Sequence, residues 1–228
     1  MRSKPAIVWP LLALALSPGM AAAQSWPDLP MPDRTQETDV AKRMVFNGLD
    51  MRAGAFESQQ NPADIVAFYR SVWEKKMVLN TLGGAQVIGH REGDYFITIQ
   101  VEGSGSGSKG EIGIVDVASA PSHVDLGRGI PQPMGAKVFN DISYPDDPVP
   151  ARTVAMRDAL SPRQNAAYFR EQLIAGGWKP ADEGPCGDDA CVLNYERGDS
   201  KVTVAAVRSA AGQSEIVVNM QNPVDVSP

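Results

Sequence analysis

Hydrophobic and polar positions follow a strand-like pattern along most of the chain, and this pattern gives way twice to the period of a helix. Apolar side chains recur every three or four positions in residues 61–73, and more thinly in residues 161–173. The flanking stretches are rich in β-branched residues and are separated by turn residues. The expected strands are 53–56, 86–88, 95–101 and 111–115 around the first helix, and 153–156, 192–195, 202–207 and 215–218 around the second. We therefore expect one or two strands, a helix and then three strands, twice over.

Both predicted helices begin with the same device. Asn61 and Ser161 can each accept a hydrogen bond from a first-turn amide, and each is followed by a proline at a position where no amide is needed. Ser161 and Gln164 additionally form the pattern of a capping box. The sequence thus predicts helix starts at equivalent places, with Gly176 and Gly177 ending the second helix.

The stretches of sequence that contain these caps resemble each other. NPADIVAFYR begins at position 61, and SPRQNAAYFR begins one hundred residues later, with further landmarks recurring at nearly the same spacing. We interpret this as two tandem copies of one module, 29–118 and 130–222. Short connections leave no room for crossovers, so we expect an α+β fold in which each module has a mainly antiparallel sheet with one helix packed on one face. The identical triplets at Val45 and Val138 have a shorter spacing, so the strand register before each helix stays open.

Three shorter segments complete the predicted organisation. They are an extension at 24–28, a linker at 119–129 and a C-terminal tail at 223–228.

The first residues indicate export. Arg2 and Lys4 precede an apolar run over 6–16, and small residues follow up to Ala23. The run is shorter than the roughly 20 residues of a spanning helix. We expect a signal peptide over 1–23, cleavage, no membrane insertion afterwards, and a periplasmic or secreted protein.

The charge argues against nucleic acid as a partner. The net charge is −6, and loss of the two leader cations would bring it to −8. Such a surface repels phosphate backbones.

A glycine-rich stretch imitates a dinucleotide-binding loop. Residues 105–110 read GSGSKG, but they connect a predicted strand to another strand, whereas a phosphate-binding loop leads into a helix. We expect a flexible hairpin loop and no bound cofactor.

The two cysteines favour a disulfide. Cys186 and Cys191 are an even pair at short spacing in a chain expected to be exported. Metal binding with Asp188 and Asp189 is the alternative, but there is no further Cys or His pair to complete a tetrahedral site.

Neither histidine has, near it in the sequence, the residues that histidine-dependent catalysis needs. No nucleophile motif accompanies His90 or His123, and we expect both to be solvated at the surface. No catalytic residue is predicted, although carboxylates brought together from distant positions remain an alternative.

Aromatic residues are the candidates for contact with a partner or ligand. Tyr69, Trp73, Phe169 and Trp178 are either core residues or the lining of a cavity between helix and sheet. Trp26 precedes the first module and is either part of a tail or an anchor on a partner or on its own module.

The repeated positions carry caps, core and turns, with no repeated reactive constellation. This favours a non-enzymatic binding or scaffolding protein of the cell envelope with a protein partner. At the level of fold, tandem helix-on-sheet modules resemble those of some outer-membrane assembly lipoproteins, although no cysteine is placed to carry a lipid. The alternatives are a carrier of a small apolar ligand, for which Tyr69 and Trp73 would line a cavity, and a hydrolase, for which a histidine would lie near a carboxylate and a hydroxyl.

Overall fold

A computed structural model describes residues 26–210 and 212–224. The predicted signal peptide lies outside these residues, as do the start of the predicted extension and most of the predicted tail.

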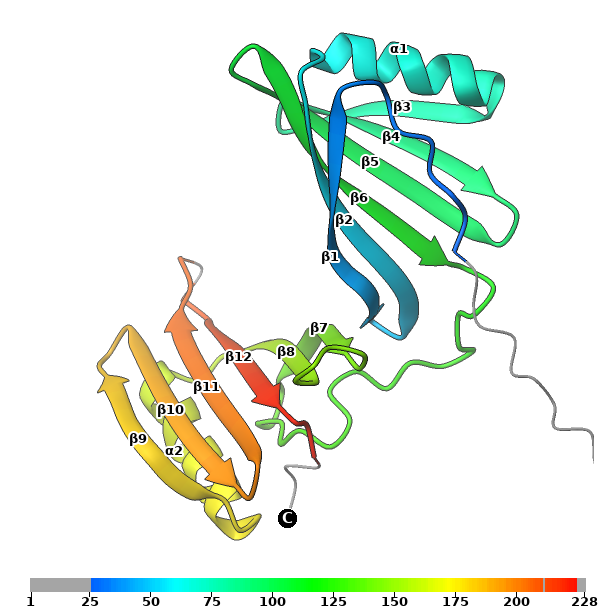
Figure 1. The fold of residues 1–228 in the computed structure, drawn as a ribbon. Helices are drawn as coiled ribbons and strands as arrows, with labels where there is room; N and C mark the ends of the chain where they lie inside the picture. Colours follow the sequence, from blue (N-terminus) through cyan, green and yellow to red (C-terminus); the bar gives the residue numbers. More distant parts are fainter. Residues whose placement is uncertain (1–25, 211, 225–228) are drawn as a thin grey trace, which may run out of the picture.

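These residues form two α-helices and a single mainly antiparallel sheet, which confirms the α+β class (Figure 1). The elements before residue 117 are β1 (Thr35–Phe46), β2 (Leu49–Ser58), α1 (Pro62–Trp73), the 3-10 turn η1 (Glu74–Lys76), β3 (Met77–Leu82), β4 (Ala85–Glu92), β5 (Tyr95–Ser104) and β6 (Gly107–Asp116). Those after it are β7 (Lys137–Tyr144), β8 (Ala151–Asp158), α2 (Pro162–Ala175), β9 (Lys179–Cys186), β10 (Ala190–Arg197), β11 (Ser200–Arg208) and β12 (Ser214–Gln221). We refer to β1–β6 with α1 as the first half and to β7–β12 with α2 as the second half.

Four strands follow each helix, so the expectation of three was wrong. The missed strands are β3 and β9, the outermost strands of the sheet. Strand β3 follows two lysines directly and looks like the end of the helix, and β9 contains two prolines and a glycine, residues that are depleted in strands.

Twelve strands form one sheet in the order β3-β4-β5-β6-β2-β1-β7-β8-β12-β11-β10-β9. Every neighbouring pair is antiparallel. Counted outward from the junction of β1 with β7, the strands of the two halves follow the same order. The triplets at Val45 and Val138 are not equivalent, since Val45 pairs near the β1–β2 turn while Val138 pairs with Met156 at the other end of its strand.

The helices begin as the sequence predicts. The side chain of Asn61 accepts a hydrogen bond from the amide of Asp64 at 3.1 Å. Ser161 and Gln164 form the reciprocal capping box, in which the amide of Ser161 donates to the Gln164 side chain at 2.9 Å. Helix α1 ends at Trp73, and Glu74 follows with a φ of 49°.

Each half has its own hydrophobic core between its helix and one face of its sheet. A chain segment preceding the first strand completes each core. Trp26, Leu29 and Met31 pack against the core of the first half. In the second half, Ile130 is buried in the core, and the carbonyl of Gln132 accepts a hydrogen bond from the Tyr168 hydroxyl at 2.9 Å.

The two halves join edge to edge through β1 and β7. Asn47 lies in the β1–β2 turn with a positive φ, followed by Gly48, the pair that two-residue hairpin turns prefer. Its amide donates to the carbonyl of Asp141, and its side-chain oxygen accepts from the Asp141 amide, each at 2.8 Å. Asn47 therefore shapes a turn in the first half and binds the backbone of the second.

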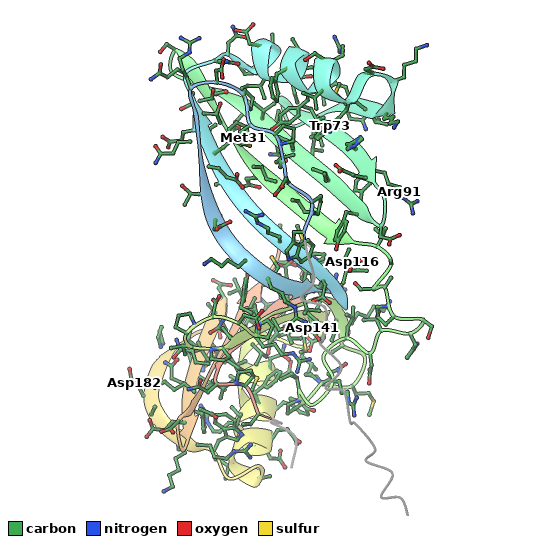
Figure 2. All side chains as sticks on the ribbon, turned by 45° about the vertical axis from the view of Figure 1, so that its right-hand side comes forward. Met31, Trp73, Arg91, Asp116, Asp141 and Asp182 are labelled. Carbon is green, nitrogen blue, oxygen red and sulfur yellow. A yellow bond between two sulfur atoms is a disulfide. The ribbon has the colours of Figure 1, made fainter. Side chains whose placement is uncertain are left out.

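Asp141, whose backbone makes these contacts, also holds its carboxylate in a network beside the junction (Figure 2). It accepts two hydrogen bonds from Arg152, at 2.9 and 2.7 Å, and one from the amide of Gly127 at 2.8 Å. Burial alone would raise the pKa of Asp141, but the hydrogen bonds from Arg152 and Gly127 and the charge of Arg152 outweigh it and lower the pKa below its ordinary value.

Candidate functional site

Four of the five aromatic candidates for a partner or ligand contact lie in the cores, which is the other role considered for them. Tyr69 and Phe169 are fully buried, and Trp73 and Trp178 are nearly so. Tyr69 stacks on Trp73 with ring centroids 4.7 Å apart. These rings fill the space between helix and sheet, so an apolar ligand would have to displace them. A contact role for them stays a prediction.

Trp26, the fifth, packs on its own half. It is half-buried, and its ring centroid lies 5.5 Å from that of Tyr95. The segment that carries it lies along the first half in Figure 1. A partner contact through Trp26 also stays a prediction.

His90 is buried, so the expectation of a solvated histidine was wrong for this residue. Its ring lies parallel to that of Trp73, with centroids 4.3 Å apart, and its Nδ1 atom lies 3.0 Å from the carbonyl oxygen of Lys76. A carbonyl only accepts, so Nδ1 carries the proton. Backbone, and not a carboxylate, therefore orients this ring nitrogen. His123 is exposed, as predicted.

A polar hollow of about 630 Å³ adjoins the Trp73–His90 stack. Its wall includes acidic and basic side chains in equal number: Asp28, Glu74, Glu92, Lys75, Lys76 and Arg91. Such a mixed lining selects neither an anion nor a cation.

A buried polar cluster lies where β8 leads into α2, and sequence reasoning missed it. One carboxylate oxygen of Asp158 accepts from the Asn165 side chain at 2.9 Å and from the Leu160 amide at 3.0 Å. The other oxygen of Asp158 and the side-chain oxygen of Asn165 are buried without a partner in the described residues. Ser58 holds the equivalent turn in the first half, because its hydroxyl accepts from the Gln60 amide at 3.1 Å. This recurring device stabilises the turn before each helix; its only signal in the sequence is a polar residue three positions before each cap.

The glycine-rich stretch lies at a β-hairpin, as predicted, but only Gly105 and Ser106 form the turn. Residues 107–110 are the first residues of β6 and pair with β5, so the expectation of a loop over 105–110 was wrong for them. The described part of the chain has no group of three or more His, Cys, Asp or Glu residues that could hold a metal ion. Cys186 and Cys191 form the predicted disulfide.

The face of the first half that points away from α1 is open, and we call it the outer face. Side chains along each strand point alternately to the two faces of the sheet. The residues on either side of a core residue in the strand therefore point to the outer face. Gln36 pairs with Glu57, Glu57 with Lys109, and Lys109 with Glu102, which makes one row across β1, β2, β6 and β5. A second row beside it runs through Thr38, Ala55, Glu111 and Gln100.

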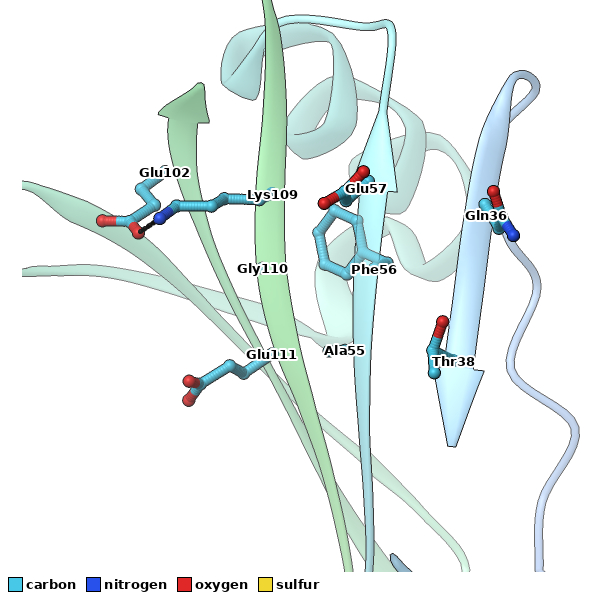
Figure 3. A pocket seen from close by; sticks show the side chains of 9 residues that line it. All are labelled: Gln36, Thr38, Ala55, Phe56, Glu57, Glu102, Lys109, Gly110 and Glu111. Atoms are coloured by element: carbon cyan, nitrogen blue, oxygen red, sulfur yellow. Dashed lines mark ion pairs between the residues drawn. The ribbon is translucent and has the colours of Figure 1, made fainter. Parts of the chain in front are cut away.

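A groove of about 550 Å³ follows these two rows (Figure 3). Ala55 contributes only a methyl group to its wall, and the edge of the Phe56 ring, which packs directly against Gly110, forms another part of it. Three glutamates, Glu57, Glu102 and Glu111, share the groove with one lysine, and Lys109 lies 3.2 Å from Glu102. The groove is therefore acidic, with an apolar part in its wall.

Comparison with known proteins adds no identification. The chain matches no family model, no curated protein and no solved structure closely enough to show kinship. In residues 26–210 and 212–224, no helix is long and apolar enough to cross a membrane.

Proposed function

We propose that the chain is an exported, non-enzymatic protein of the cell envelope that binds a protein partner along the groove of the outer face. The observation that carries this proposal is the open face itself. The helix and the segment around Met31 cover one face of the first-half sheet, while the opposite face presents a groove lined from four strands.

The chemistry of the groove suggests the kind of partner. Two rows of side chains crossing four strands offer a surface suited to an extended or helical protein segment. The three glutamates exceed the single lysine by two charges, so the segment that enters should carry basic residues. Ala55 and the edge of the largely buried Phe56 ring add an apolar part to the wall.

Export rests on two features that support each other. The leader pattern over 1–23 is that of a signal peptide. The Cys186–Cys191 disulfide suits an oxidising compartment, either the periplasm or the exterior.

We also infer that the two halves are copies of one module. The same strand order, the same helix starts and the same covering segments recur in both. Phe68 and Tyr69 meet edge to face with ring centroids 5.1 Å apart, and Tyr168 and Phe169 meet the same way at 5.4 Å. The acidic groove described above lies in the first copy, and we infer that this copy binds the partner.

The carrier and the hydrolase have less support. The stacked rings of Tyr69 and Trp73 occupy the place where a carried ligand would lie, and Nδ1 of His90 is bound to backbone.

Site-specific photo-crosslinking in living cells tests the proposal. A photoreactive amino acid at Thr38, in the groove, should yield a discrete adduct with a protein partner. The same amino acid at Lys201, on a strand of the second half, is the matched control. The charge reversal Glu111→Lys should abolish the Thr38 adduct. An identical set of adducts from both positions, or an adduct that survives the reversal, would contradict a site in the groove.

A further inference from the structure

The two outer edges of the sheet differ in a way that concerns assembly. In the described chain no strand lies beyond β3 or beyond β9, so each presents backbone donors and acceptors on its outer side. Such an edge is a template for another strand unless it is protected by prolines, charges or bulges.

Edge strand β9 is protected by all three means. Its sequence, KPADEGPC, contains two prolines and three charged residues. Its pairing with β10 shifts register twice. A proline has no amide to donate, so a second strand cannot form a regular ladder on this side.

Edge strand β3 has none of these protections. Its sequence, MVLNTL, contains no proline and no charge, and it pairs with β4 from Met77 to Leu82 without a register shift. Val78 is 62% exposed and Leu82 is 68% exposed. With Asn80 they form the outward-facing row of this strand, while Met77 and Leu79 are half-buried on the other side.

We propose that β3 is a dimerisation edge on which β3 of a second copy pairs antiparallel about a two-fold axis at Asn80. A two-fold axis perpendicular to the sheet places the same face of both copies on the same side. Each residue must therefore pair with a residue whose side chain points to that same face. The register centred on Asn80 sets Val78 opposite Leu82 of the second copy, twice by symmetry. It thereby buries the two most exposed apolar side chains of the strand and pairs the two Asn80 amides.

Charge permits this pairing. The strand is uncharged, and Lys76 directly precedes it. In the centred register Lys76 of one copy lies eight strand positions from Lys76 of the other, about 26 Å at the rise of an extended chain. Charges that far apart are screened at physiological ionic strength, where the Debye length is about 8 Å.

The same mode of contact already operates within the chain, where β1 and β7 join two halves edge to edge. Because β9 is blocked, a chain has one open edge, and pairing closes at a dimer instead of continuing into a filament. This inference does not depend on the proposed partner groove, which lies on β1, β2, β5 and β6.

Light scattering of the purified protein across a wide concentration range tests the dimer. The mass should rise toward that of two chains. Val78→Lys should weaken the dimer by about tenfold or more, because both copies lose an apolar pair. The side chain is exposed in the single chain, so folding should be little affected. Val207→Lys, at a half-exposed valine on β11, is the matched control and should leave the dimer intact.

A cysteine at position 80 tests the register. The chain's own two cysteines are joined to each other, so Asn80→Cys adds one free thiol, and the two copies of it should form a disulfide across the axis. Thr81→Cys, one residue away and on the other side of the strand, should crosslink much more slowly. A single-chain mass at every concentration, a dimer unaffected by Val78→Lys, or equal crosslinking at both positions would overturn the proposal.

Discussion

The part of the second half that adjoins the junction should depend on the carboxylate of Asp141 more than on any other charge near it. In Asp141→Asn the new amide can accept at one atom only, whereas the carboxylate accepts three hydrogen bonds, two of them from Arg152. A hydrogen bond to a charged group contributes about 1.5 to 3 kcal/mol when it is buried. The Asp141 side chain is 13% exposed, so solvent replaces little of what is lost. We expect the free energy of unfolding at neutral pH to fall by about 3 kcal/mol.

The stability that the Asp141 carboxylate contributes should depend on pH. The folded pKa of Asp141 lies below its ordinary value of about 3.9. Such a group contributes stability that is present above the unfolded pKa and is lost as the pH falls through the folded pKa. The difference between wild type and Asp141→Asn should therefore be constant from pH 7 to about pH 5 and should shrink in more acidic solution.

Urea unfolding followed by circular dichroism at several pH values measures both effects. Asp146→Asn is the control, since Asp146 is 58% exposed and lies 3.6 Å from Arg43. An exposed pair of this kind contributes at most about 1 kcal/mol. Equal losses for the two variants at neutral pH, or a loss at Asp141 that persists unchanged to pH 3, would refute the assigned role.

Three further predictions concern core packing, backbone packing at a glycine and the disulfide. In urea unfolding, Phe169→Ala should lower the free energy of unfolding by roughly 3 to 5 kcal/mol, because the ring is fully buried. Ser161→Ala should lower it by about 1 kcal/mol through loss of the helix cap. Similar losses for the two variants would mean that the ring is not a core anchor. Gly110→Ala should lower the melting temperature sharply, because a Cβ there overlaps the Gln100 carbonyl and the Phe56 ring. Gly103→Ala, where the surrounding space is open, should lower it only slightly. A small decrease for Gly110→Ala as well would contradict the close packing. Thiol labelling of the protein without reductant should modify neither cysteine, and two labelled thiols would contradict the disulfide.

Local signals were enough to predict much of the fold. The caps at Asn61 and Ser161 are short-range hydrogen-bonding devices, so they can be recognised from a few neighbouring residues. The disulfide likewise could be predicted from the close spacing of the two cysteines and the expected compartment.

Features that depend on tertiary contacts could not be predicted from the sequence. His90 stands beside Arg91 and Glu92 and looks like a surface residue, but strand alternation turns it inward onto Trp73. The pairing of β1 with β7 involves few residues, and only the fold brings Asn47 to Asp141.

The groove escaped for the same reason. Glu57 is far in the sequence from Glu102 and Lys109, and strand pairing alone makes the three a row. Their residue types gave no signal, because single charged residues on predicted strands are ordinary for a solvated face.

The most direct test of the account is the affinity of the crosslinked partner, once isolated, for the wild-type protein and for two charge reversals. Glu111→Lys changes the groove, and Glu171→Lys makes the same change of net charge on the exposed side of α2. Calorimetric titration at low and high salt should show tight, salt-sensitive binding to wild type and to Glu171→Lys, with a loss of at least about tenfold for Glu111→Lys. Equal affinity for all three proteins would contradict binding through the groove.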